Sequence, residues 1–223
     1  MIKSIYFALY DKKHIFTQKR TMEAVLTADI INSRDVYPEI WLPIVKNVLN
    51  TIGKEYTAWE VYRGDSIQII TTPIKALDYA ILLKSTIKQL SSLDIRIAIG
   101  IGAISYRSEK VSASNGLAFI NSGEAFDTLG KKTLAVKTPW EDFDEVITIM
   151  LDLATLTMND WKPAMAEIFK KQWENPEVKQ IDIAKALNKK QSNVSYSLKK
   201  AGYEEILNTV SYYKREIEKL CYS

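Results

Sequence analysis

The sequence predicts an α+β protein: a ferredoxin-like βαββαβ sheet domain followed by an all-α helix-turn-helix domain. In the first part, short runs rich in β-branched residues alternate with segments whose apolar residues recur at helical spacing. The last third has no strand-like run, and it contains two short amphipathic segments that are joined by a brief polar turn.

The breaks in these patterns divide the chain into four segments. Thr138-Pro139-Trp140 ends the strand pattern, and the following helix is apolar on almost all sides from Phe143 to Leu156, so we expect it to be buried between domains or subunits. We expect an N-terminal extension at 1–21 (a short extra strand or the product of an upstream start), the sheet domain at 22–137, a connecting helix at 138–157 and the helix-turn-helix domain with a C-terminal helix at 158–223.

The elements of the sheet domain follow in order. A strand that ends in polar residues is expected over 22–30, and a helix over 38–53, where Pro38 suits the first turn and Gly53 the C-terminal cap. Gly64-Asp65 separates two β-rich runs, 56–63 and 66–72, which predicts a hairpin. The remaining expected elements are a helix from residue 73, an apolar and therefore central strand over 94–104, a short helix over 115–129 and a strand over 132–137.

Composition excludes several classes of protein. The 223 residues are 47% hydrophobic and 26% charged, which excludes a disordered or low-complexity chain. One cysteine, Cys221, and one histidine, His14, exclude an internal disulfide and thiolate- or histidine-rich metal sites, so any metal must be a hard cation held by oxygen ligands. No 18-residue apolar run occurs, and we expect a soluble cytoplasmic protein with no membrane partner.

The excess positive charge is local. The last third, 157–223, contains 12 of the 30 basic and 9 of the 27 acidic residues, so the net charge of +3 lies there. Most of it falls in 178–203, where six lysines face one aspartate. A basic patch of this kind indicates an anionic partner and says nothing about the fold.

Two aspartates form a candidate metal site. Asp29 ends the first strand and Asp65 lies at the tip of the hairpin, and in a βαββαβ sheet the third strand lies beside the first. Two convergent carboxylates and the backbone carbonyl of Ile30 would suit Mg²⁺, while Ser33 and the sharp turn at Gly64 would leave room for a phosphate. Aspartates are also ordinary turn residues, which explains each of them separately.

These segments resemble the class III nucleotide cyclases. Asp29–Ser33 (DIINS) is similar to their D-I-x-x-S segment, Gly64-Asp65 to their G-D metal motif, 95–102 (IRIAIGIG) to their L-R-I-G-I-x-x-G strand and Phe119–Asn121 to their V-N dipeptide. The order of all motifs over about 22–200 more closely resembles the SatD family, which adds a C-terminal helix-turn-helix. The resemblance implies a cyclase-like domain, Mg²⁺ or Mn²⁺ and a nucleotide as cofactors, and Asn121 as a further nucleotide-binding residue.

Two departures from the cyclase pattern bear on activity. The position of the cyclases' transition-state arginine is Ala125 here, and the position of their ATP-specific lysine is Val61. Preorganised cations of this kind are commonly worth 10²–10³ in rate. Arg34, Arg63, Arg96 or Arg107 could substitute, and Glu124 is either a third acidic ligand or a carboxylate in the first turn of its helix.

The C-terminal segment predicts contacts with DNA. Apolar residues in 180–187 and 191–202 are spaced to pack two short helices across each other, and the second helix opens with polar residues that would face base edges. A three-helix module that binds protein, or has a purely structural role, is the alternative. The candidate DNA-binding residues are Lys189, Lys190, Gln191, Ser192, Asn193, Ser195, Lys199 and Lys200.

The last helix carries Ile206, Val210, Tyr213, Ile217 and Leu220 at steps of four and three. This seam either joins two protomers or packs on the helix-turn-helix of its own chain.

The expected function is that of a DNA-binding transcriptional regulator, a homodimer on double-stranded DNA. Its cyclase-like domain would sense a nucleotide or mediate dimerisation without efficient cyclase activity. The alternatives are a Mg²⁺-dependent nucleotide cyclase, or related nucleotide-processing enzyme, that uses Asp29 and Asp65, and an interaction module that binds no DNA. The sequence alone identifies no catalytic residue.

Overall fold

The structure is a computed structural model that describes residues 21–222, so the expected N-terminal extension lies outside the described residues except for its last position. The strands are β1 (Met22–Ile31), β2 (Trp59–Tyr62), β3 (Ser66–Thr71), β4 (Asp94–Tyr106), β5 (Asn115–Gly116) and β6 (Leu134–Lys137). The α-helices are α1 (Pro38–Ile52), α2 (Pro73–Ile87), α3 (Leu117–Asp127), α4 (Glu141–Asn159), α5 (Pro163–Glu174), α6 (Gln180–Ala186), α7 (Gln191–Lys200) and α8 (Tyr203–Tyr222). This α+β content agrees with the sequence prediction.

The central sheet has the order β2-β3-β1-β4, with antiparallel neighbours throughout. β6 pairs with β4 in parallel, and the short β5 extends the far end of β4. The third strand therefore lies beside the first, as the sequence predicted. In this register Asp29 faces Ser66 on one side and Arg96 on the other.

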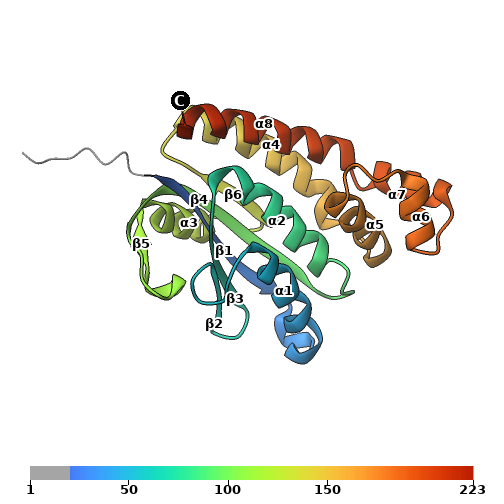
Figure 1. The fold of residues 1–223 in the computed structure, drawn as a ribbon, viewed down its shortest axis with the longest axis horizontal. Coiled ribbons are helices and arrows are strands. Elements are labelled where there is room, and N and C mark those ends of the chain that lie inside the picture. Colours follow the sequence, from blue (N-terminus) through green and yellow to red (C-terminus); the bar gives the residue numbers. More distant parts are fainter. Residues whose placement is uncertain (1–20, 223) are drawn as a thin grey trace, which may run out of the picture.

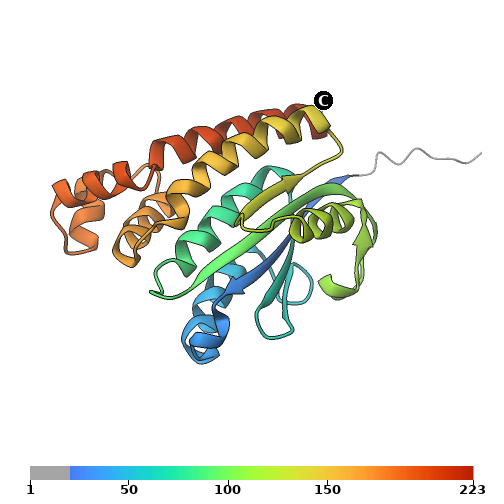
Figure 2. The same ribbon diagram turned by 180° about the vertical axis from the view of Figure 1, so that it is seen from behind.

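Helices cover both faces of the sheet (Figure 1). α1, α2 and α4 supply the core of one face, and α3 lies against the other. α8 runs alongside α4, and α5, α6 and α7 lie together at one end of the molecule, as both views show (Figure 2). The largest cluster of buried apolar residues extends from Ala24 in β1 to Ile217 in α8, so the sheet and the C-terminal helices share a core, and two smaller clusters lie on the α3 side of the sheet.

Two glycines of β4 let α3 lie close to the sheet. A Cβ at Gly100 would lie 2.1 Å from the Ser122 backbone nitrogen, and one at Gly102 would lie 2.7 Å from the Ala118 nitrogen. The buried Asn121 side chain donates from Nδ2 to the Ile101 carbonyl oxygen at 2.7 Å. The glycine pattern of the strand thus serves backbone-to-backbone packing of α3.

Within the described chain, the connecting helix α4 is buried on one side, and burial of its other side against a second subunit stays a prediction. Phe143, Ile147 and Leu151 are buried, whereas Leu153 and Leu156 are 64% and 70% exposed. β6 and α8 pack against the first side, and no described element covers the second.

The seam of α8 is used within the chain. Ile206, Val210, Tyr213 and Ile217 are buried, and the Tyr213 hydroxyl donates to the Pro73 carbonyl oxygen at 2.7 Å. Lys214 pairs with Asp78 of α2 at 2.6 Å. α8 therefore packs on α2 and α4 more than on the helix-turn-helix, and this seam is not free to join two protomers.

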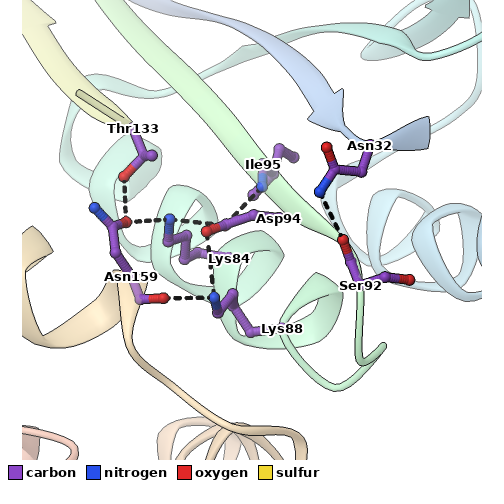
Figure 3. Close-up of polar contacts among 8 residues, drawn as sticks. All are labelled: Asn32, Lys84, Lys88, Ser92, Asp94, Ile95, Thr133 and Asn159. Carbon is purple, nitrogen blue, oxygen red and sulfur yellow. Dashed lines mark hydrogen bonds and ion pairs between the residues drawn. The ribbon is translucent and has the colours of Figure 1, made fainter. Parts of the chain in front are cut away.

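A buried polar cluster joins α2, β4 and the end of α4 (Figure 3). The Lys84 ammonium group lies 2.8 Å from Asp94 Oδ1 and 2.7 Å from Asn159 Oδ1, which also accepts from the Thr133 hydroxyl. Lys88 donates to the Asn159 carbonyl oxygen at 2.6 Å, which satisfies a free carbonyl at the end of α4. Burial lowers the pKa of Lys84 to about 8, although Asp94 opposes this shift.

In the part of the chain that the structure describes, no helix combines the length and the apolar character that crossing a membrane requires.

Replacing Gly100 with Ala is expected to destabilise the protein by about 3 kcal/mol or more, because the new methyl group meets backbone that cannot rotate away. Gly123→Ala is the matched control, since its Cβ would meet nothing within 4 Å and the helix interior favours Ala by up to about 1 kcal/mol. Urea unfolding measures both changes, and equal stabilities would contradict the close approach.

Lys84→Met tests the buried ammonium group. The folded pKa of about 8 lies below the ordinary value of 10.5, so the unfolded chain binds more protons between these pH values and wild-type stability rises with pH there. Relative to Lys84→Met, the wild type should gain about 2–3 kcal/mol from pH 8 to 10.5. Urea unfolding across this range measures it, with Lys162→Met, an exposed position, as the control. A difference that does not vary with pH would contradict the assignment.

Candidate functional site

The two candidate metal-binding aspartates lie side by side, Asp29 near the end of β1 and Asp65 in the hairpin loop between β2 and β3. The Ile30 amide donates to the Asp65 carbonyl oxygen at 3.3 Å, which joins the end of β1 to the hairpin loop. That loop, 63–65, turns with positive φ at Arg63 (52°) and Gly64 (96°), a conformation that glycine adopts at little cost. Hairpin geometry and strand pairing together bring the Asp29 and Asp65 backbones side by side.

Their carboxylates have different partners. Asp29 Oδ2 accepts from Arg96 Nη2 at 3.0 Å, and its Oδ1 lies 3.4 Å from the Ser66 hydroxyl. The Asp65 carboxylate instead accepts a hydrogen bond from the Ser33 hydroxyl. The side chain of Ile30 is buried in the core. Each aspartate is therefore held by its own neighbours.

The two aspartates also line separate hollows. Asp65 lines a hollow of about 530 Å³ beside α1, which we call the α1 hollow, together with Ser33, Arg34, Tyr37, Trp41, Arg63 and Gly64 among others. Asp29 lines a second hollow of about 470 Å³, the β4 hollow, with Asn32, Arg96, Lys131 and Lys132 among others. The segment Asp29–Ser33 runs between them.

No three His, Cys, Asp or Glu side chains of residues 21–222 are grouped so that they could hold a metal ion. The predicted ligand set would not reach three such side chains in any case, because it contains two carboxylates and one backbone carbonyl. As they lie, Asp29 and Asp65 line different hollows. Binding of Mg²⁺ or Mn²⁺ stays a prediction, and no chemical step is assigned to it.

The other predicted nucleotide-binding residues divide in the same way. Ser33 and Gly64 line the α1 hollow, whereas Asn121 lines none of the hollows described and is used to hold α3 on β4. Glu124 lies in the third turn of α3 and pairs with Lys137, so the expectation of a first-turn carboxylate is wrong. The cause is that α3 begins at Leu117, seven residues before Glu124.

Five basic side chains surround the end of β1. Arg34 and Arg63 line the α1 hollow, and the β4 hollow is lined by Arg96, Lys131 and Lys132. Arg96 also lies over the Phe126 ring at 5.1 Å, which fixes its guanidinium group. Asp35 and Asp65 balance the charge of the α1 hollow, so the surplus of positive charge lies in the β4 hollow.

Trp41 is a residue that sequence reasoning missed. It is 1% exposed and lines the α1 hollow, and its Nε1 has no hydrogen-bond partner among the described residues. A buried donor without a partner costs about 1–3 kcal/mol, so such atoms commonly face a site that a ligand or water fills. The sequence showed only an apolar helix position, because burial beside a hollow depends on the fold.

The predicted helix-turn-helix is formed by α6 and α7. Ile183 and Ala184 of α6 and Val194 and Leu198 of α7 are buried where the two helices meet. Asn188 ends α6 in the left-handed region (φ 51°), and the Lys189 amide donates back to the Ala184 carbonyl oxygen at 2.8 Å. This turn directs the chain into α7.

Helix α5 supports the motif through aromatic packing. Trp161 and Phe169 have ring centroids 4.2 Å apart, and Tyr203 meets Phe169 edge-on at 5.4 Å. Trp161 Nε1 donates to the Ala201 carbonyl oxygen at 3.0 Å. These aromatic side chains are core residues, as the sequence predicted, and are not available to stack on bases.

The start of α7 is open to solvent. Lys190, Gln191, Ser192 and Asn193 are exposed, and Ser195 is partly buried. At the far end of the helix, Lys199 and Lys200 are exposed and line a hollow beside α4. Lys189 differs from the other lysines, since it pairs with Glu167 of α5 at 3.1 Å.

Tyr196 is a second residue that sequence reasoning missed. It is 65% exposed on α7, three residues beyond Asn193 and three before Lys199, and so shares their face of the helix. A tyrosine hydroxyl is a common phosphate contact in DNA complexes. The spacing in the sequence would have found it, because Tyr196 lies one helical turn from both Asn193 and Lys199.

Comparison with known proteins identifies no relative. No protein-family model matches the chain, and a search of the curated proteins finds no match. The SatD-like interpretation therefore rests on the motifs alone and stays a prediction.

Proposed function

We propose that this protein is a DNA-binding regulator in which α7 reads double-stranded DNA and the sheet domain binds a nucleotide. The observation that carries the proposal is the exposed polar start of α7. Gln191 and Asn193 can each form paired hydrogen bonds with adenine, and Lys190 beside them has no ion-pair partner among residues 21–222. A DNA-reading role agrees with the cytoplasmic location that we expect from the sequence.

The packing of α6 supports the same proposal. The buried side of α6 packs against α5 and against the apolar side of α7. The polar side of α7 therefore faces outward, as a helix that enters the major groove requires. The lysines Lys179 and Lys190 have no acidic partner in the described chain. Uncompensated lysines around a polar helix face favour phosphate contacts over a purely structural role.

A nucleotide is the proposed ligand of the sheet domain. The strand order β2-β3-β1-β4 supports a ferredoxin-like, cyclase-like domain, and five basic side chains surround the segment Asp29–Ser33, where the cyclase-like pattern expects phosphates. Trp41, whose buried Nε1 has no partner among the described residues, also lines the α1 hollow. Arg34, Arg63 and Lys131 have no ion pair with another described residue, so they are free to meet an anion.

A nucleotide-processing enzyme is the second candidate. It would require Asp29 and Asp65 to share one Mg²⁺ or Mn²⁺ ion, whereas Asp29 is paired with Arg96 and the two aspartates line separate hollows. Binding without efficient turnover is therefore the better supported role. In this proposal a bound nucleotide acts by changing the spacing of two reading helices in a homodimer.

Lys190→Glu should weaken binding to a random-sequence DNA duplex. Reversing the charge beside a phosphate removes about one contact, so the slope of log affinity against log salt should fall by about 1. Mobility shift over a salt series measures it. Lys54→Glu, the same change on an exposed residue that follows α1, should match the wild type. Absence of salt-dependent retardation by the wild type would remove the regulator proposal in favour of the interaction module.

Gln191→Ala and Asn193→Ala should behave differently from the lysine variant. Each should leave the salt slope unchanged and lose about 1–3 kcal/mol of preference at the bases it contacts. Selection of binding sequences from a random pool, followed by competition with the selected site, measures this preference. An unchanged selected sequence would show that α7 is not the reading helix.

Arg63→Ala should weaken binding of fluorescent ATP or GTP analogues by about 10-fold or more, because hydrogen bonds to a charged group are worth about 1.5–3 kcal/mol. Arg107→Ala is the control, since Arg107 pairs with Glu23 away from both hollows. Titrations with and without Mg²⁺, and with Asp65→Asn, show whether a cation takes part. Turnover of ATP or GTP that disappears in Asp65→Asn would establish the enzyme instead.

A further inference from the structure

Helix α4 carries an unpartnered apolar stripe. Val146, Ile149, Leu153 and Leu156 are 42%, 57%, 64% and 70% exposed, and no other described element packs over them. Their spacing of three, four and three residues puts them on one face of the helix, opposite the face that Ile147 and Leu151 bury in the core. We call these four residues the α4 stripe.

The α4 stripe has the geometry of one strand of a coiled coil. Apolar residues at alternating steps of three and four form the seam through which two helices interdigitate. Exposed apolar residues are normal when scattered, but a contiguous row of four along an otherwise anchored helix marks an interaction surface. Because α4 is already held against the sheet and α8, the free energy of binding a partner is not reduced by the cost of ordering this helix.

We propose that the α4 stripe binds the α4 stripe of a second copy of this chain, with the two helices antiparallel. In that arrangement Val146 lies opposite Leu156 of the other copy, and Ile149 lies opposite Leu153. Each facing pair then contains one β-branched residue and one leucine, so the two kinds of side chain alternate across the seam.

The charges at the two ends of α4 favour a second copy of the chain as the partner and favour the antiparallel orientation. Glu141, Asp142 and Glu145 are exposed at the N-terminal end, and no ion pair to another described residue involves them. The neighbouring basic residues of α8, Arg215 and Lys219, are already paired with Glu216.

The opposite end of the stripe is basic. Lys199 and Lys200 line the hollow that Leu153 and Thr157 also line, and one acidic residue, Glu205, lines it with them. The hollow at this end of the stripe therefore carries more positive than negative charge. Antiparallel packing places the acidic end of each helix against the basic end of the other, whereas parallel packing would place like charges together.

The dimer requires neither DNA nor nucleotide binding, and its failure would leave both proposed functions open to their own tests. It would also bring two α7 helices to the same side of one assembly, because Lys199 and Lys200 at the end of α7 border the same seam.

Sedimentation velocity of the full-length protein over a range of concentrations tests the proposal. The wild type should be a dimer, and Leu153→Asp should raise the dimer dissociation constant at least about 10-fold, because it buries a charge in an apolar seam. Ile120→Asp, at a 51% exposed apolar residue of α3, is the matched control and should stay dimeric. Dissociation by Ile120→Asp but not by Leu153→Asp would place the dimer interface on α3 and overturn the proposal, as would a monomeric wild type.

Charge reversal tests the partner and the orientation together. Lys199→Glu/Lys200→Glu should weaken the dimer, and adding Glu141→Lys/Asp142→Lys to the same chain should restore it. A combined variant as weak as the first would contradict the antiparallel pairing. If the wild type is monomeric and a variant without residues 2–20 is dimeric, the N-terminal segment and not a second copy occupies the stripe.

Disulfide trapping distinguishes the two orientations directly. In a Cys221→Ser background, Val146→Cys/Leu156→Cys should form an intermolecular disulfide on mild oxidation, because these positions face each other in the antiparallel dimer. Val146→Cys alone should stay reduced. Efficient cross-linking of the single variant would show a parallel dimer and would overturn the orientation.

Discussion

The Lys84 ammonium group is buried where α2, β4 and the C-terminal end of α4 meet, and the placement of α4 depends on how its charge is satisfied. Moving an ammonium ion out of water costs several kcal/mol, which the Asp94 carboxylate and the Asn159 amide oxygen offset in part, so the pKa of Lys84 stays below its ordinary value. Lys88 binds the Asn159 carbonyl oxygen as well. Apolar packing would tolerate a slide of α4 along the sheet, whereas these directional contacts allow one position.

This anchor explains how the helix-turn-helix is held on the sheet domain. α5 begins four residues after Asn159, and the aromatic packing of Trp161 and Phe169 continues the core into α6 and α7. A ligand at the end of β1 would lie on the same strand pair, β1 and β4, that carries Asp94 at its edge. The structure therefore offers a continuous packed route from the hollows to α7, without showing that a signal uses it.

Local patterns predicted the elements well and the site less well. The hairpin at Gly64, the central strand that contains Gly100 and the two helices on either side of Asn188 all follow from periodicity and turn residues. The site depends on side-chain direction, which periodicity leaves open. Asp29 on β1 does lie beside Asp65 in the hairpin loop, yet their carboxylates bind different partners, Arg96 and Ser33, and line separate hollows. The sequence does not identify these partners, because Ser33 lies 32 residues from Asp65 and Arg96 lies 67 residues from Asp29.

The sequence by itself determined which segments are helix and which are strand, the order in which they follow, and the location of the excess lysines near α7, since these properties depend on near neighbours in the chain. Tertiary structure decided the rest. It placed α3 against Gly100, used the α8 seam inside the chain, and left the α4 stripe uncovered. A helix with apolar residues on all sides can bury any one of them. Only the folded chain determines which side of α4 packs against α8 and which side stays exposed to solvent.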